Sequence, residues 1–221
     1  MKDNPHLLKN RDEFFNLIKK CNGTFREISP SLYLYKKIVE MHNCSKNINE
    51  LLQDNEFFEL IYITLKAWNM NQRKAKLAPF NEFKKSIQDN ESTINELYPY
   101  RLESLSQTEL ESVLNKLKLL FYNLNVMKSK TKIVGVSKTL HFLLPHLVIP
   151  MDRKYTMDFF YGHNAYSQNI DKEFQIFKEI FNKSYEIAKQ LKLSNKDIDN
   201  FNWNTSVPKL IDNAIIGMKS K

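Results

Sequence analysis

The chain has 221 residues, 42% of them hydrophobic, enough to bury one large core or two small ones. Lys and Arg total 33 against 25 acidic residues, and the resulting net charge of +8 at pH 7 favours a polyanionic partner, nucleic acid above all. The alternative is that the excess lysine only keeps the surface soluble. The two cysteines, Cys21 and Cys44, stand in no ligand-spaced pattern, which argues against a disulfide framework and a zinc site.

Hydrophobic residues recur at helical spacing along the chain, and four glycines are too few for many tight hairpins. The sequence therefore predicts an all-α protein. Ser29 and Pro30 form a start signal for one helix, and Thr108 with Glu111 forms a capping-box pattern for another. The predicted helices cover a first segment around 14–18, one that starts at Pro30, and 55–68, 108–127, 137–144, 171–191 and 207–217.

We expect one compact helical unit over 1–221, or two helical lobes with a cleft between them: about 1–105 with the C-terminal helices, and 106–168. Two basic connectors, 69–77 and 125–134, lie between predicted helices, where their positive side chains could reach a partner. No apolar run approaches the ~20 residues that span a bilayer, so we expect a cytoplasmic, monomeric protein that does not contact membranes.

The segment 132–153, KIVGVSKTLHFLLPHLVIPMDR, is the stretch in which residue choice points to chemistry rather than packing. Gly135 is predicted to form the turn before a helix that starts at Ser137. The unpaired N–H groups at such a helix start, beside Lys130 and Lys132, suit a phosphate. The competing interpretation is that the glycine only ends a helix and the lysines are solvated.

Two residues of this segment could act in catalysis. Lys138 is predicted on the first helical turn in apolar surroundings, which favours the neutral amine that can attack a sugar C1′ and form a Schiff base. Asp152 follows an apolar, proline-bearing stretch and precedes a helix, so it could cap that helix while its carboxylate activates water or stabilises an oxocarbenium-like sugar. Taken singly, a solvated lysine and a plain capping aspartate explain the same positions.

The order GVSK followed by VIPMD resembles the GVGxK hairpin and the later aspartate of the helix-hairpin-helix DNA glycosylases, nearest to divergent 8-oxoguanine glycosylase-like members. The match spans 22 residues of the chain. Ser137 replaces the second hairpin glycine, and Lys138 comes one position early, 14 residues before Asp152.

The resemblance implies a DNA N-glycosylase that flips an altered base out of the duplex and breaks its bond to C1′, with Asp152 assisting and Lys138 as nucleophile. AP-lyase activity depends on Lys138, and a monofunctional enzyme would use water instead. The implied partner is double-stranded DNA with a modified base, in repair or in defence against phage DNA; no metal and no small-molecule cofactor are needed. The DNA-contacting residues implied are Lys130, Lys132, Gly135, Val136, Ser137 and Arg153.

Trp68 and Met70 end a predicted buried helix just before a basic connector. Trp68 could stack on an extruded base, with Met70 beside it in a base pocket, although a tryptophan on an apolar helix is more often part of the core. His141 and His146 are five residues apart, which does not suit a metal site, and we interpret them as core or surface residues.

Two other classes of function remain open. The first is a non-catalytic module that holds DNA or RNA on the same scaffold. The second is a helical interaction protein in which the motif is a coincidence.

Overall fold

The computed structural model describes residues 10–24, 29–71, 75–162, 167–199 and 203–219. Residues 72–74, part of the predicted basic connector 69–77, lie outside this range. Within it, the chain forms helices and two isolated β-bridges, Leu77 with Met127 and Asp199 with Asn204, but no strand. The prediction of an all-α protein is confirmed.

The α-helices follow one another through the chain in the order α1 (Arg11–Asn22), α2 (Pro30–Cys44), α3 (Ile48–Gln53), α4 (Asn55–Ala67), α5 (Phe80–Gln88), α6 (Glu91–Leu97), α7 (Gln107–Asn123), α8 (Ile133–Leu143), α9 (Asp158–Tyr161), α10 (Ile170–Gln190) and α11 (Val207–Gly217). A π-helical turn, η2 (Arg153–Met157), leads into α9, and a 3-10 turn, η3 (Asn195–Asp197), follows α10. Among the described residues, no helix has the length and hydrophobicity that crossing a bilayer requires.

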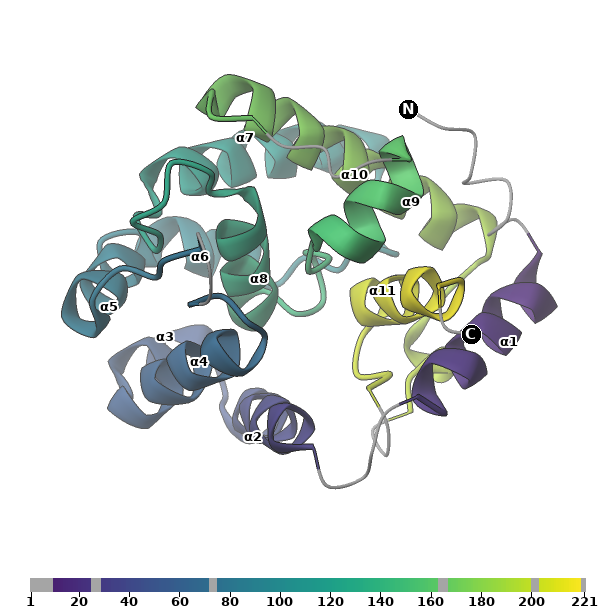
Figure 1. Cartoon of the computed structure of the whole chain (residues 1–221), viewed down its shortest axis with the longest axis horizontal. Helices are drawn as coiled ribbons and strands as arrows, with labels where there is room; N and C mark the ends of the chain where they lie inside the picture. The colour runs from purple at the N-terminus through teal and green to yellow at the C-terminus, as the bar shows by residue number, and fades with distance from the viewer. Residues whose placement is uncertain (1–9, 25–28, 72–74, 163–166, 200–202, 220–221) are drawn as a thin grey trace.

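Two helices, α8 and α11, lie inside the molecule rather than on its surface. Figure 1 shows α8 near the centre, with α7 and α10 on one side of it and α4 on the other, and α11 beside α1. Every residue of α8 except Val134 is buried, and every residue of α11 except Ile216. A helix that is buried all round must be covered on every face, so these two helices anchor the apolar core.

Close helix packing explains the glycine near the end of α11. A β-carbon on Gly217 would lie 2.0 Å from the backbone carbonyl oxygen of Leu17 on α1. Only a residue without a side chain lets the two backbones approach this closely. The first helix is thereby held against the last one.

The predicted helix starts are confirmed for α2, which Pro30 opens, and for α11, where the Ser206 hydroxyl caps the backbone N–H of Lys209. For α7 the predicted cap is wrong by two residues. Ser106 and Glu109 form the capping box instead of Thr108 and Glu111, and the helix ends at Asn123 rather than at Met127.

Candidate functional site

A pocket of about 590 Å³ opens between the segment that follows α4 and the segments around α8. One side of the pocket therefore comes from the predicted lobe 1–105, and the other side comes from the predicted lobe 106–168. Its wall is formed by Trp68, Asn69, Met70, Ala75, Met127, Ser129, Thr131, Ile133, Val134, Gly135, Lys138, Asp152 and Arg153. Six residues singled out from the sequence, namely Trp68, Met70, Gly135, Lys138, Asp152 and Arg153, thus line one pocket.

Lys138 and Asp152 form an ion pair in the pocket wall. The Lys138 Nζ lies 3.3 Å from Asp152 Oδ2, and the exposed fractions of the two side chains are 8% and 35%. The lysine is thus enclosed, while the carboxylate remains open to the pocket. An ammonium hydrogen-bonded to a carboxylate is a charge-assisted contact, and it brings a proton donor next to a proton acceptor.

Asp152 is held in place by the turn that it opens. Its Oδ1 accepts the backbone N–H of Lys154 at 2.7 Å, and its own backbone N–H donates to the Thr156 hydroxyl at 3.0 Å. The predicted capping role is therefore confirmed. The preceding Met151 N–H donates to Ser137 Oγ at 3.2 Å, which ties this segment to α8 and brings Asp152 to Lys138.

Trp68 stands at the C-terminal cap of α4 and forms an aromatic part of the pocket wall. Its ring centroid lies 4.9 Å from that of Phe142 and 5.7 Å from that of Tyr35. The Lys138 Nζ lies over the same ring, 5.6 Å from its centroid. The indole is thus packed against the core and also contributes a surface to the pocket.

The predicted glycine turn is wrong. The helix α8 starts at Ile133, so Gly135 is its third residue and Lys138 its sixth rather than a first-turn residue. Gly135 instead lies close against the Met127 side chain: a β-carbon there would lie 2.3 Å from Met127 Sδ, so a larger residue would need that side chain to move. Val136, the fourth residue of the helix, is fully buried and does not stand on an outward-facing corner, which corrects its predicted role as a DNA contact.

Ser137 is also fully buried, which corrects its predicted place at the start of a helix facing a phosphate. Its hydroxyl donates to the Val134 carbonyl at 3.1 Å and accepts from Met151 as described above. Both of its polar contacts are therefore internal. Ser137 positions the Asp152 segment, and we do not retain it or Val136 as a DNA contact.

The N-terminus of α8, predicted to receive a phosphate, is capped by the protein itself. Glu173 of α10 is 1% exposed, and its Oε2 accepts the Lys132 backbone N–H at 2.8 Å. Burial raises the pKa of Glu173, and the backbone N–H groups of Lys132 and Ile133 oppose that shift. A carboxylate 41 residues further along the chain cannot be assigned to this helix end from local sequence.

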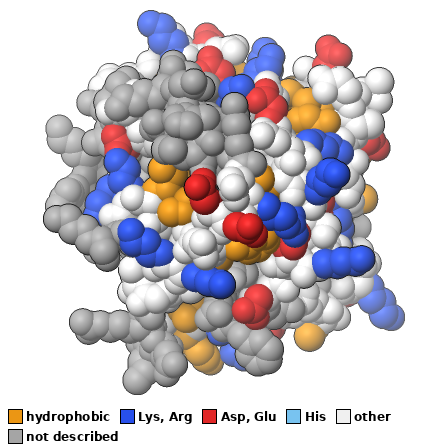
Figure 2. All heavy atoms as spheres, turned by 90° about the vertical axis from the view of Figure 1, so that its right-hand side faces the viewer, with side chains coloured by type: hydrophobic (Ala, Val, Ile, Leu, Met, Phe, Trp, Pro, Cys, Tyr) orange, Lys and Arg blue, Asp and Glu red, His pale blue; other side chains and the backbone are white. Residues whose placement is uncertain are grey.

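The basic residues proposed for DNA contact differ in their surroundings. Lys130 is exposed, and the Lys132 Nζ donates to Asn125 Oδ1 at 3.0 Å. Arg153 lines the pocket, where its Nη2 donates to the Thr131 hydroxyl at 3.0 Å. On the face shown in Figure 2, Lys and Arg side chains are interspersed with Asp and Glu, so the described part of that face is not uniformly basic.

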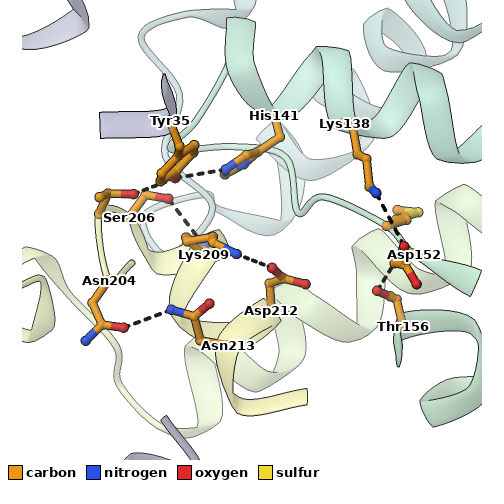
Figure 3. A network of polar contacts seen from close by, with 12 residues as sticks. Tyr35, Lys138, His141, Asp152, Thr156, Asn204, Ser206, Lys209, Asp212 and Asn213 are labelled. Carbon is orange, nitrogen blue, oxygen red and sulfur yellow. Dashed lines mark hydrogen bonds and ion pairs between the residues drawn. The ribbon is translucent and has the colours of Figure 1, made fainter. Parts of the chain in front are cut away.

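A second ion pair lies directly beneath the pocket and was missed from the sequence. Lys209 and Asp212 of α11 are paired, with side chains only 4% and 6% exposed (Figure 3). The Lys209 Nζ lies 5.6 Å from the Trp68 ring centroid and 5.3 Å from that of Trp203. Burial raises the pKa of Asp212, and the Lys209 ammonium opposes this shift. The sequence pattern that could have predicted this pair is two opposite charges three residues apart on a largely apolar helix.

His141 belongs to a buried polar network close to Lys209 (Figure 3). Its Nδ1 faces the Val148 carbonyl at 2.8 Å and must carry the proton, so Nε2 accepts from the Tyr35 hydroxyl at 3.1 Å. The Tyr35 oxygen in turn pairs with the Thr205 hydroxyl at 2.6 Å. Burial, together with the charge of Lys209, lowers the pKa of His141 to about 3. His141 is therefore a neutral core residue, as predicted.

No group of three or more metal-ligating side chains occurs within the described ranges. Comparisons with protein-family models, with curated proteins and with solved structures find no match to this chain. Function is therefore inferred from the geometry of the pocket.

Proposed function

We propose that the protein is a DNA glycosylase that excises a modified base from double-stranded DNA, with the pocket beside Lys138 and Asp152 as its base site. One observation carries the proposal. A lysine and an aspartate 14 residues apart in sequence meet at 3.3 Å in the wall of a pocket that Trp68 also lines. Base excision through C1′ can use such a set, with a nucleophile or proton donor, a carboxylate and a surface for stacking.

The two groups can share the chemistry of the first step. Transfer of a proton from the Lys138 ammonium to Asp152 Oδ2, across their existing hydrogen bond, produces a neutral amine and a carboxylic acid. The amine attacks C1′ as the C1′–N bond breaks, and the base leaves with the bonding electrons and takes up the proton held on Asp152. The substituted amine then loses a proton to the Asp152 carboxylate, and opening of the sugar ring gives the Schiff base that borohydride reduces. If water attacks instead, the Asp152 carboxylate accepts the proton of the water, and no covalent intermediate forms.

The pocket suits an extruded base in size and in lining. Its volume of about 590 Å³ lies in the range of pockets that hold small organic ligands. Trp68 supplies a flat surface for stacking, and Met70 and Met127 add apolar contacts that tolerate different shapes. Arg153 in the pocket wall and the exposed Lys130 supply positive charge for the DNA backbone.

The test is incubation with duplexes that carry oxidised, deaminated, alkylated or phage-type bases, with and without borohydride. We expect base release that falls at least about a hundredfold in Asp152→Asn, because the carboxylate acts in the transition state. A borohydride-trapped adduct that is lost in Lys138→Gln identifies the lysine as nucleophile. Lys183→Gln, which alters an exposed ion pair on α10, serves as the control.

Release without trapping leaves Asp152 as the catalytic group and makes the enzyme monofunctional. If none of these bases is released by a folded protein, the catalytic proposal is wrong. Salt-sensitive binding that weakens in Lys130→Gln would then favour a non-catalytic DNA-binding module.

A further inference from the structure

The buried ion pair of Lys209 and Asp212 is not explained by the stability of the fold alone. The two residues lie on α11, which is otherwise apolar between Val207 and Gly217 apart from Asn213. Removing two charges from water costs several kcal/mol, and apolar residues of similar volume often serve equally well. What the two charges face is therefore a better explanation of the pair than stability alone.

The Lys209 ammonium faces the aromatic wall of the pocket. It lies over Trp68 and Trp203, and its partner Asp212 holds it there. Lys209 is 3% exposed and does not line the pocket, so it reaches Trp68 from the core side. Lys138 does line the pocket, and its Nζ also lies 5.6 Å from the Trp68 ring centroid. One indole thus interacts with two ammonium groups that the protein itself supplies.

This arrangement determines which bases the ring can bind. The face of an indole attracts cations because its quadrupole is negative there, and a desolvated cation over tryptophan is a favourable contact. In this pocket the indole of Trp68 already interacts with two cations, the ammonium groups of Lys138 and Lys209. A cationic base would have to share the ring with two positive charges, whereas an uncharged base adds no third positive charge beside them.

The remaining charges of the pocket also disfavour a cationic base. Arg153 adds a guanidinium to the wall, and the Asp152 carboxylate is already paired with Lys138. Figure 3 shows the Lys209–Asp212 pair next to the Lys138–Asp152 pair, and the two carboxylates are close enough to influence each other. No unpaired acid among the described lining residues offers a counter-ion to a positively charged base.

We propose that Lys209, held by Asp212 beneath Trp68, is a specificity-determining residue that makes the pocket select uncharged modified bases over cationic, N-alkylated ones. The inference rests on the proposed function, since it names the substrate class of the same pocket. Lys209 acts through Trp68 and touches no substrate, so it is a positioning residue.

A pair of isomeric bases provides the sharpest test. At neutral pH, 1-methyladenine is a cation, and N6-methyladenine is its uncharged isomer with nearly the same volume. Each is placed opposite an abasic analogue, so that neither base is paired and both are equally free to leave the stack. The affinity for each duplex relative to the unmodified one, and the release of each base in a single turnover, are measured at fixed salt.

The variant is Lys209→Met/Asp212→Leu, which removes both charges and leaves no buried carboxylate without a partner. Its control is Lys183→Met/Glu186→Leu, which removes a pair of the same spacing from the surface of α10. Thermal melting verifies that both proteins fold. We expect the wild-type protein and the control to prefer N6-methyladenine about tenfold, and the variant to lose most of that preference.

Equal affinity for the two isomers, a preference for the cation, or an undiminished preference in Lys209→Met/Asp212→Leu would each overturn the inference. So would the absence of any binding above that of the unmodified duplex, because the pocket would then take no base. Base release decides the proposed function separately. A protein that releases 1-methyladenine as readily as its isomer is still a glycosylase but lacks the selectivity inferred for Lys209.

Discussion

Three histidines, two of them buried and one half-buried, should make the stability of this protein fall steeply in mild acid. Burial lowers the pKa of His42 to about 4, that of His141 to about 3 and that of His146 to about 4, whereas histidine in an unfolded chain titrates near 6.5. Between these values the unfolded chain binds more protons than the folded one. The stabilisation is therefore fully present above pH 6.5 and is lost as the pH falls towards 4.

The magnitude follows from the size of the shifts. Between pH 7 and pH 5, each histidine lowers the free energy of unfolding by about 2 kcal/mol, or about 6 kcal/mol for the three. A loss of this size is comparable with the whole stability of many domains. Burial raises the pKa of Glu173 and of Asp212, which favours the folded state at low pH and offsets a part of the loss.

The assay is urea denaturation at constant ionic strength at pH 7 and at pH 5, for the wild-type protein and for His146→Gln. His146 is the least buried of the three, so its replacement should disturb the fold least. We expect the variant to lose about 2 kcal/mol less than the wild type between the two pH values. An equal loss in both proteins, or a wild-type loss below about 1 kcal/mol, would refute the reasoning that these histidines are held neutral.

Two further predictions concern packing and buried charge. Gly217→Ala should destabilise the protein by about 1–3 kcal/mol in urea denaturation, because the new methyl group would collide with the Leu17 carbonyl oxygen. Gly23→Ala, whose nearest contact is 3.5 Å away, is the control and should change stability by less than about 0.5 kcal/mol. Lys209→Met alone should cost about 3–5 kcal/mol, since it leaves Asp212 buried without its counter-ion, whereas adding Asp212→Leu should recover most of that loss in thermal melts.

Helix positions were predictable because hydrophobic spacing is a local property of the chain. The predicted helices 171–191 and 207–217 correspond to α10 (Ile170–Gln190) and α11 (Val207–Gly217). The start of α7 was not predictable to the residue, because two overlapping capping-box patterns are present. The structure uses Ser106, next to Leu105, whose carbonyl accepts a hydrogen bond from Tyr185 of α10. The Ser106 cap thus lies next to a contact with α10, whereas the Thr108 pattern was predicted from local sequence alone.

The glycine at position 135 shows why the start of α8 was predicted wrongly. Glycine occurs both where a chain turns and where another group approaches the backbone closely, and sequence does not distinguish the two. Here Met127 occupies the space that a side chain would need, and Glu173 caps the helix from α10. The contact with Met127 and the cap from Glu173 are both tertiary contacts, which local sequence does not reveal.

The sequence by itself determined that the chain is helical, that Asp152 caps a turn, and that Lys138 and Asp152 are candidate site residues. Only the tertiary structure decided that these two residues meet, that Trp68 and Met70 line the same pocket, and that Lys209 lies beneath Trp68. The physical reason is the separation along the chain of the residues that interact. Helix formation and capping depend on neighbours within a few residues, whereas a pocket is assembled by core packing between segments far apart in the chain.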